Sequence, residues 1–214
     1  MNLFSIITLL SLALCAFTFP NPPNQFNAQV RVTDSTHGVS FKAGIHFDYG
    51  QKRAAIDYGK NDYGFPEVAV TDCDHGNIFS YDTNSSCSVF CESGENCFGD
   101  GPCNCDIQDI WILLELSQNM GTCQMGDKSG TKWVYEDNTQ ETKFSFCMNE
   151  DTPLWINTAQ ETTQLNSTTY FDSFKDEVPD AHFFAMPDNC SCEAPEEKRT
   201  VSKQKSPLDI LFKK

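Results

Sequence analysis

The sequence is poor in basic residues and lacks the common catalytic motifs. Its 214 residues include 15 Lys and Arg against 30 Asp and Glu, a formal net charge of −15 at pH 7. Nucleic-acid-binding proteins gather Lys and Arg against phosphates, so this composition argues against that class of partner. The chain has only four histidines, and it contains no Gly-x-Ser-x-Gly, His-Glu-x-x-His or Gly-rich phosphate-binding motif. We therefore expect a protein that is not an enzyme.

Long apolar runs are also absent after residue 19. The one such stretch, residues 3–19, has no charge, lies at the N-terminus and is followed at once by Pro-Asn-Pro-Pro. Its length and position indicate a signal peptide, residues 1–16, cut near Ala16, rather than a membrane span. An uncleaved signal anchor is the alternative. We expect the mature protein to be extracellular, or to lie in the lumen of a secretory or lysosomal vesicle.

Cysteine, by contrast, is abundant. Of 11 cysteines, Cys15 belongs to the signal peptide, which leaves ten. An even number in an exported chain indicates disulfides, and sequence alone does not give their pairing. The cluster in 87–105 lacks the paired Cys-x-x-Cys spacing of zinc sites, so disulfides are favoured there over zinc. The ten expected to form disulfides are Cys73, Cys87, Cys91, Cys97, Cys103, Cys105, Cys123, Cys147, Cys190 and Cys192.

Two kinds of surface feature are typical of an exported protein. Asn-x-Ser/Thr sequons predict glycosylation at Asn84, Asn166 and Asn189. Carboxylates crowd between Asp72 and Asp109, and oxygen ligands of this kind suit calcium. No stretch matches the helix–loop–helix calcium loop. We expect no cofactor, with weak calcium binding as the alternative to a solvated acidic surface.

Apolar residues alternate with polar ones in several short runs. In residues 39–48 the odd positions are all apolar, which predicts a strand with one buried face. A turn at 49–51 and a second run at 52–58 complete a hairpin. Further runs predict strands, with turns roughly every ten residues, typical of an antiparallel sheet or barrel. These runs are 67–70, 77–81, 110–116, 131–136, 142–148 and 154–157; a helix at 110–120 is the alternative, and 171–186 is expected to hold a helical turn.

The chain divides by composition into four parts. Residues 17–26 are expected to be an extended leader and 27–192 a single β domain that carries a Cys-rich insertion at 87–105. Residues 193–214 hold six basic and four acidic residues with few apolar ones, which predicts a flexible tail. An interaction or sorting peptide around Ile210, Leu211 and Phe212 is the alternative for this tail.

Two motifs resemble one extracellular family. The segment 45–58 ends a strand in Phe47-Asp48, turns over four residues and continues with Arg53 and then Ile-Asp-Tyr at 56–58. This is similar to the first hairpin of ependymin-like and LolA-like domains, which also occur ahead of some papain-type proteases. A Phe-x-x-Pro-x-x-Cys at 184–190 is similar to the family's closing motif. Asp48 and Arg53 are expected to pair across the turn.

The resemblance implies a mainly β fold: a strongly curved antiparallel sheet, or half-barrel, whose concave face is hydrophobic and binds lipids or other apolar ligands. By alternation, nine side chains are candidates for that face, although they would equally fill a closed core. The alternative function is an extracellular interaction or matrix protein, or a protease-associated one, with no pocket and an unknown partner; a hydrolase using Asp109 and Glu115 ranks third. The nine candidates are Phe41, Ile45, Phe47, Ile56, Tyr58, Trp133, Tyr135, Phe144 and Phe146.

Overall fold

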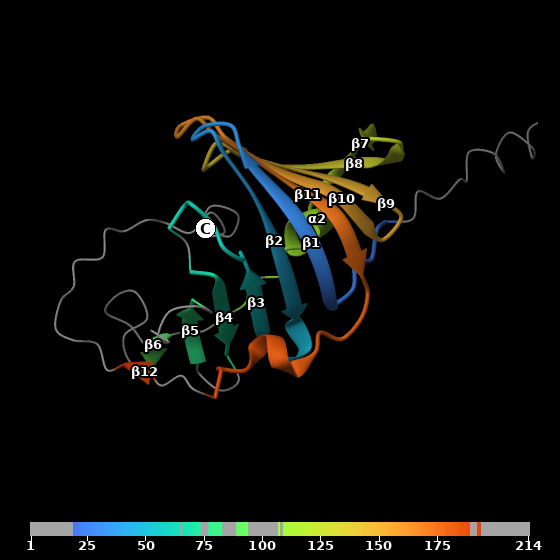
Figure 1. Cartoon of the computed structure of the whole chain (residues 1–214). Coiled ribbons are helices and arrows are strands. Elements are labelled where there is room, and N and C mark those ends of the chain that lie inside the picture. The colour runs from blue at the N-terminus through green and yellow to red at the C-terminus, as the bar shows by residue number, and fades with distance from the viewer. Residues whose placement is uncertain are drawn as a thin grey trace, which may run out of the picture.

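A single twelve-stranded sheet dominates the structure, a computed structural model that describes residues 19–64, 66–73, 77–82, 89–93, 107, 109–188 and 192–193. Every neighbouring pair of strands is antiparallel except β12 and β6, which run parallel. The strand order is β12-β6-β5-β4-β3-β2-β1-β11-β10-β9-β8-β7 (Figure 1). The strands are β1 (Gln25–Asp34), β2 (Val39–Asp48), β3 (Arg53–Asp57), β4 (Val68–Asp72), β5 (Asn77–Tyr81), β6 (Val89–Ser93), β7 (Gln118–Met125), β8 (Lys128–Asp137), β9 (Thr142–Asn149), β10 (Thr152–Gln160), β11 (Leu165–Lys175) and β12 (Cys192–Glu193).

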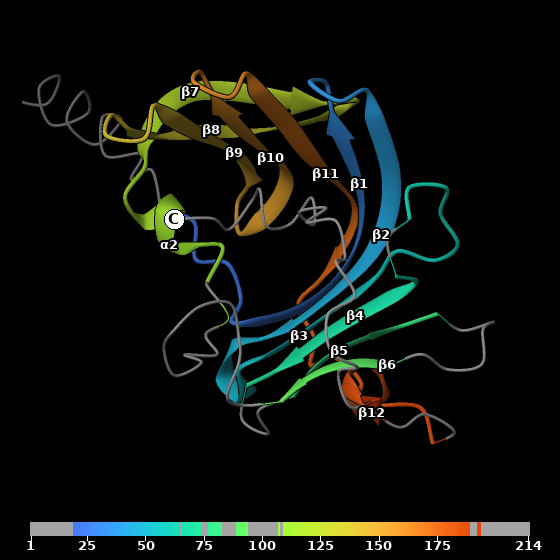
Figure 2. The ribbon, with the colours of Figure 1, turned by 90° about the vertical axis from the view of Figure 1, so that its left-hand side faces the viewer.

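Helices are few and short. Among the described residues they are the 3₁₀ turns η1 (Tyr49–Gln51) and η2 (Ala181–Phe184) and the four-residue α2 (Ile112–Glu115). The sheet curves strongly and is not closed, because β12 and β7 form its two edges (Figure 2). The helix α2 lies on the concave side, and η2 packs against the convex side of β3 and β4. The predicted fold class is thus confirmed.

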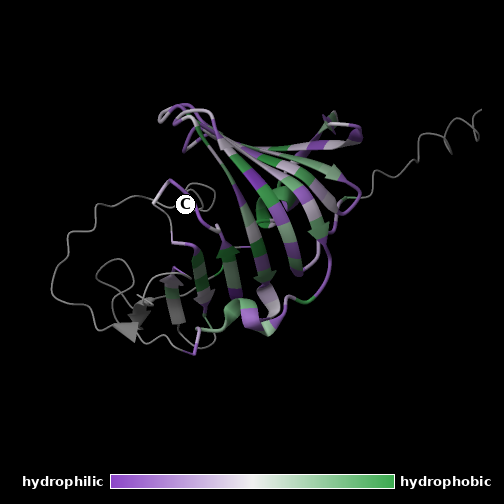
Figure 3. Cartoon of the chain, in the orientation of Figure 1, coloured by the Kyte–Doolittle hydropathy of each residue, from purple (hydrophilic) through white to green (hydrophobic). Residues whose placement is uncertain are grey.

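Alternation explains how the strands curve around a core. In β1, Phe26, Ala28, Val30 and Val32 are buried on the concave side, while the residues between them are polar and more exposed. Figure 3 shows the same alternation of hydrophobic and hydrophilic residues along the strands. A period of two puts side chains at alternate positions on one face, so β1 buries its apolar face on the concave side.

Aromatic rings hold the concave core together. Phe26 is 0% exposed, and its ring stacks on Phe47 at a centroid distance of 5.2 Å and on Phe174 at 5.0 Å. The ring of Trp111, just before α2, lies 5.8 Å from that of Phe26. Aromatic pairs at such distances add to the stabilisation that comes from the area they bury. This cluster joins β1, β2 and β11 to the segment that carries α2.

The convex side carries a second core beneath η2. Phe184 of η2 packs with Ala55, Val70 and Phe79, which come from β3, β4 and β5. The guanidinium of Arg53 lies between this core and the turn: it stands 4.4 Å over the ring of Phe184, and its Nη2 donates to Asp48 Oδ2 at 3.1 Å. The expected pairing of Asp48 with Arg53 is therefore confirmed.

A disulfide, Cys123–Cys147, ties edge strand β7 to β9 across β8. The residue of β8 opposite Cys123 is Gly130, and a Cβ at this position would collide with the backbone carbonyl of Met148 in β9. Glycine thus lets β8 approach β9 closely at the point that the disulfide crosses. The side chain of Trp155 packs on this disulfide cluster, and its Nε1 donates to the carbonyl oxygen of Gln124 at 3.2 Å.

The structure differs from the sequence expectations in three places. Residues 110–116 do not form the predicted strand. They form a turn and the helix α2, which agrees with the alternative prediction of a helix in this segment. The strands β1, β6, β7, β11 and β12 had not been predicted. Strand β1 begins at Gln25, inside the expected leader, and Phe26 is buried in the core. The hairpin of β2 and β3, the strands β4, β5, β8, β9 and β10 and the helical turn η2 are confirmed within a few residues.

Other expectations fall mostly outside the described residues. These are the signal peptide, the tail, the sequons at Asn84 and Asn189, and the insertion at 87–105 except for β6. The described part of the chain contains no helix that is long and apolar enough to cross a membrane.

The docking of η2 predicts a loss of stability in acid. The ring of His46 in β2 stacks on Phe183 of η2 at 3.5 Å, and its Nδ1 donates to Asn27 Oδ1 at 2.6 Å. The pKa of His46 is lowered from 6.5 to about 4, mainly by burial, which outweighs the opposing charge of Asp57, with a smaller contribution from the nearby His182. Because folding lowers this pKa, the unfolded state binds a proton on His46 more readily than the folded state does. The contribution of neutral His46 to the free energy of unfolding is therefore complete above pH 6.5 and declines as pH falls towards 4.

We therefore expect the His46 imidazole to titrate near pH 4 in an NMR experiment on the folded protein. The free energy of unfolding, measured with urea, should fall between pH 6.5 and 4, and His46→Gln should reduce that fall. A His46 pKa of about 6 or above, close to that of an exposed imidazole, would contradict this account of the packing.

Candidate functional site

A cavity of about 180 Å³ lies between the concave face of the sheet and the segment that carries α2. Side chains from β1, β2, β3, β8, β9, β10 and β11 line its sheet side, and Asp109, Ile110, Ile112 and Leu113 line the other. Most of the lining is apolar. The lining residues are Val30, Val32, Phe41, Ala43, Ile45, Phe47, Ile56, Tyr58, Asp109, Ile110, Ile112, Leu113, Tyr135, Asp137, Gln140, Phe144, Phe146, Ile156, Thr158, Thr169 and Phe171.

The structure brings eight of the nine candidate residues to this cavity. They are Phe41, Ile45, Phe47, Ile56, Tyr58, Tyr135, Phe144 and Phe146. The ninth, Trp133, is buried in the same core but does not line the cavity, and its ring packs edge-on against Phe19 at 4.9 Å. The alternation in this strand had correctly placed Trp133 on the concave face. There Phe19, from the segment before β1, packs against its ring.

The sequence analysis missed the rest of the lining for identifiable reasons. Val30 and Val32 lie in β1, whose alternation over residues 26–34 was a usable signal. Thr158 in β10 and Thr169 in β11 are polar residues on the buried face, so no hydrophobic alternation marks them. Ile110, Ile112 and Leu113 had been read as part of a strand rather than as a cover over the sheet.

Hydrogen bonds fix the segment that covers the cavity. The backbone N–H of Ile110 donates to the hydroxyl of Tyr49 at 3.2 Å, and that of Trp111 donates to Asp109 Oδ1 at 2.8 Å. Burial raises the pKa of the Tyr49 hydroxyl, so the hydroxyl stays neutral. The side chain of Ile112 lines the cavity and is still 56% exposed, which places it at the mouth.

Besides two tyrosines, five polar side chains interrupt the apolar lining: Asp109, Asp137, Gln140, Thr158 and Thr169. They differ in their partners. Asp137 Oδ1 accepts hydrogen bonds from Thr139 Oγ1 at 2.6 Å and Thr139 N at 2.9 Å, and these bonds lower the pKa of Asp137. Burial raises the pKa of Asp109, and the charge of Glu115 raises it further. The hydroxyls of Thr158 and Thr169 are buried and have no hydrogen-bond partner.

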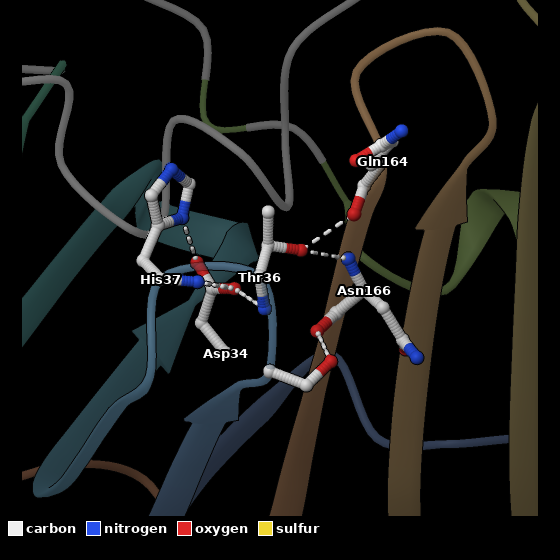
Figure 4. A network of polar contacts seen from close by, with 6 residues as sticks. Asp34, Thr36, His37, Gln164 and Asn166 are labelled. Atoms are coloured by element: carbon white, nitrogen blue, oxygen red, sulfur yellow. Dashed lines mark hydrogen bonds and ion pairs between the residues drawn. The ribbon is translucent and has the colours of Figure 1, made fainter.

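A polar network joins the β1–β2 turn to the β10–β11 turn (Figure 4). Asp34 accepts from the backbone N–H of Thr36 at 2.9 Å and pairs with His37 Nδ1 at 2.7 Å. The hydroxyl of Thr36 donates to the Gln164 carbonyl oxygen at 2.6 Å and accepts from the Asn166 N–H at 3.0 Å. Burial alone would raise the pKa of Asp34, but the bonds from His37 and Thr36 outweigh it and lower the pKa.

The remaining predicted sites are only partly described. Cys123 and Cys147 form a disulfide and Cys73 is also disulfide-bonded, whereas Cys87, Cys97, Cys103, Cys105 and Cys190 lie outside the described residues, as do the side chains of Cys91 and Cys192. The described sequon residue, Asn166, is exposed in β11. No group of three metal-ligating side chains occurs among the described residues, which hold only part of the acidic stretch considered for calcium.

Comparisons with known proteins identify the fold. No family model matches the sequence, and no curated protein matches it. The structure is similar to an uncharacterized conserved protein from Thermus thermophilus, with 10% identity and a TM-score of 0.52 over 88% of this chain and 98% of that one. This likeness shows a shared fold.

Two weaker likenesses are to other bacterial proteins. One is to the MucA/MucB complex of Pseudomonas aeruginosa, with 13% identity and a TM-score of 0.46 over 80% of this chain and 58% of that one. The other is to a LolA superfamily protein from Nitrosomonas europaea, with 8% identity and a TM-score of 0.36 over 78% of this chain and 93% of that one.

The raised pKa of Asp109 predicts that this carboxylate costs stability at neutral pH. Folding raises the pKa above 3.8, so the protein is most stable with Asp109 protonated and loses stability as pH rises through the folded pKa. Asp109→Asn keeps the oxygen that accepts from Trp111 and removes the charge. We expect it to raise the melting temperature at about pH 7, with a gain that disappears towards about pH 3.

The exposed Asp127→Asn is the matched control and should leave the melting temperature unchanged at both pH values. A lower melting temperature for Asp109→Asn at neutral pH would mean that the Asp109 charge itself holds α2 in place, against this interpretation.

Proposed function

We propose that this chain is a secreted, disulfide-bonded glycoprotein without enzymatic activity that binds an apolar small molecule or lipid in the cavity on the concave face of its sheet. The observation that carries the proposal is the cavity itself. If the apolar side chains of the concave face served only as a core, they would pack closely and leave no such space. We further propose that the domain is related to ependymin-like and LolA-like domains. The resemblance of the first hairpin and the pairing of Asp48 with Arg53 support this relation.

The chemistry of the lining supports binding rather than catalysis. Eight aliphatic and aromatic candidate side chains surround the space, and apolar surface of this kind favours an apolar guest by roughly 25 cal/mol for each Å² removed from water. The carboxylates considered as a hydrolytic pair do not share the cavity: Asp109 lines it, whereas Glu115 is exposed outside it.

The disulfide supports an oxidising compartment. Cys123–Cys147 is buried beneath Trp155, and such bonds persist outside the reducing cytosol. A compartment of that kind agrees with the N-terminal apolar stretch and with the exposed sequon at Asn166.

Filling the cavity is expected to abolish binding. Ala43 lines it and is buried on the concave face of β2, so Ala43→Phe places a ring in the space that a ligand would occupy. The neutral dye N-phenyl-1-naphthylamine, whose fluorescence rises in apolar surroundings, serves as the probe. We expect the native protein to bind the dye and the variant to bind it at least about tenfold more weakly, a change of about 1.4 kcal/mol.

Ala159→Phe is the matched control, because Ala159 lies opposite Lys143 and Asn166 on strand β10 and does not line the cavity. It should bind the dye as the native protein does. If Ala43→Phe fails to fold, Ile112→Glu at the exposed mouth gives the same test. No dye binding by the native protein, or equal binding by the cavity variants, would contradict the proposed function.

A further inference from the structure

The outer side of α2 is an exposed apolar surface at the mouth of the cavity. Ile112 is 56% exposed, and Leu116, which caps the helix, is 61% exposed. The two residues are four apart, so their side chains lie on one side of the helix. Leu114 is fully buried and Leu113 lines the cavity, which leaves Glu115 as the one polar residue of residues 112–116. A helix with apolar residues on nearly every side is normally covered, by its own protein or by a partner.

The cavity beside this surface has room for about one apolar side chain. Its volume is about 180 Å³, and an apolar cavity of roughly 150 Å³ binds benzene. Ile112 belongs to both features, because it lines the cavity and is also exposed. The cavity and the outer side of α2 at Ile112 and Leu116 therefore form one continuous apolar site, which we call the mouth site. Its occupant should combine one ring with further apolar groups beside it.

The charged residues around the mouth site are acidic. Asp109 and Asp137 line the cavity, and Glu115 is exposed on α2. Among the described lining residues none is Lys, Arg or His. An occupant with basic residues next to its apolar ones therefore gains from charge as well as from burial, whereas an anionic lipid surface would be repelled.

The C-terminal segment of this chain has that composition. Residues 208–212 are Leu-Asp-Ile-Leu-Phe, and Lys213 and Lys214 follow them directly. Residues 198–214 carry six basic residues and one acidic residue, whereas the rest of the chain carries nine basic and 29 acidic ones. Opposite net charges attract the segment to the body of the protein, and its apolar residues then match the mouth site.

The chain is long enough to bring this segment to the mouth site. Glu193, the last described residue, ends β12 at one edge of the sheet. The 14 residues from 194 to 207 span up to about 46 Å, at about 3.3 Å each. Strand β3, whose Ile56 lines the cavity, is four strands from β12, about 19 Å at 4.8 Å for each strand. A segment tethered at this length reaches an effective concentration of about 1 mM, so even a weak contact is well populated.

We propose that residues 208–212 of this chain dock on the mouth site, with the Phe212 ring in the cavity and Ile210 and Leu211 over the outer side of α2, and that an apolar ligand must displace them. The cavity has the size of one ring, and the two lysines after Phe212 then face the acidic residues of the mouth. The docking itself does not depend on ligand binding; the competition with a ligand rests on the proposed function.

Isoleucine-methyl NMR of the full-length protein without ligand tests the docking. In the native protein we expect nuclear Overhauser effects between the Phe212 ring protons and the Ile112 methyl groups. In the triple variant Ile210→Ser, Leu211→Ser, Phe212→Ser the Ile112 signals should shift, because their apolar cover is lost. Val201→Ser, which changes an apolar residue of the tail outside 208–212, is the matched control and should leave the Ile112 signals in place.

Other occupants give different spectra. Unchanged Ile112 signals in the triple variant, with no Overhauser effect from Phe212, would overturn the proposal. Native signals that move with protein concentration would assign the occupant to the tail of a second copy. Signals that respond to phosphatidylcholine vesicles but not to the triple variant would assign it to a lipid surface. Either result would contradict docking within one chain.

Dye binding tests the competition separately. The triple variant should bind N-phenyl-1-naphthylamine about three- to tenfold more tightly than the native protein, because no tail side chain has to be displaced. The difference should shrink at about 1 M salt, where the Debye length is about 3 Å and the attraction of the lysines is screened. Equal affinities of the two proteins would overturn the competition. If neither protein binds the dye, the proposed function is wrong, while the methyl spectra still decide whether residues 208–212 dock.

Discussion

The concave face of the sheet is larger than the helix that covers it, and the cavity follows from this mismatch. The four residues of α2 span about 6 Å, at about 1.5 Å for each residue, while the ten residues of β2 extend for roughly 33 Å. The alternation that makes each strand amphipathic supplies apolar side chains along that whole length. The segment that carries α2 covers only part of these apolar side chains. Its position is fixed by the packing of Trp111 on Phe26 and by the hydrogen bond from the Ile110 N–H to the Tyr49 hydroxyl.

The aromatic cluster and the cavity overlap only in part on the concave face. Phe26 and Trp111 pack where the cover meets the sheet and do not line the cavity, whereas Phe47 belongs to both. The convex side adds its own support through η2, whose Phe184 lies under Arg53 and whose Phe183 stacks on His46. These contacts support β2 and β3 from the convex side, so the curvature of the sheet does not depend on a fully packed concave face.

Periodicity made much of this fold predictable and left identifiable gaps. Residues 39–48 alternate so regularly that the strand and its buried face were predicted, and the turn at 49–51 predicted the hairpin. The Asp48–Arg53 pair was expected from the resemblance of this hairpin to ependymin-like and LolA-like domains. Thr158, Thr169 and Ser167 are polar on the buried face, so β11 gave no signal, and the leucines of 113–116 are compatible with a strand as well as with a helix. Which end of the sheet α2 covers depends on contacts between residues far apart in the chain, such as that of Phe26 with Trp111, and no local pattern encodes them.

The position of the bound dye tests the account most directly. Isoleucine methyl groups line the cavity from the sheet, at Ile45, Ile56 and Ile156, and from the cover, at Ile110 and Ile112. With isoleucine methyls labelled, the account predicts nuclear Overhauser effects between the aromatic protons of bound N-phenyl-1-naphthylamine and methyl groups of both sets. Effects confined to the exposed Val178, observed with valine labelling, or the absence of any effect to Ile156, would contradict it.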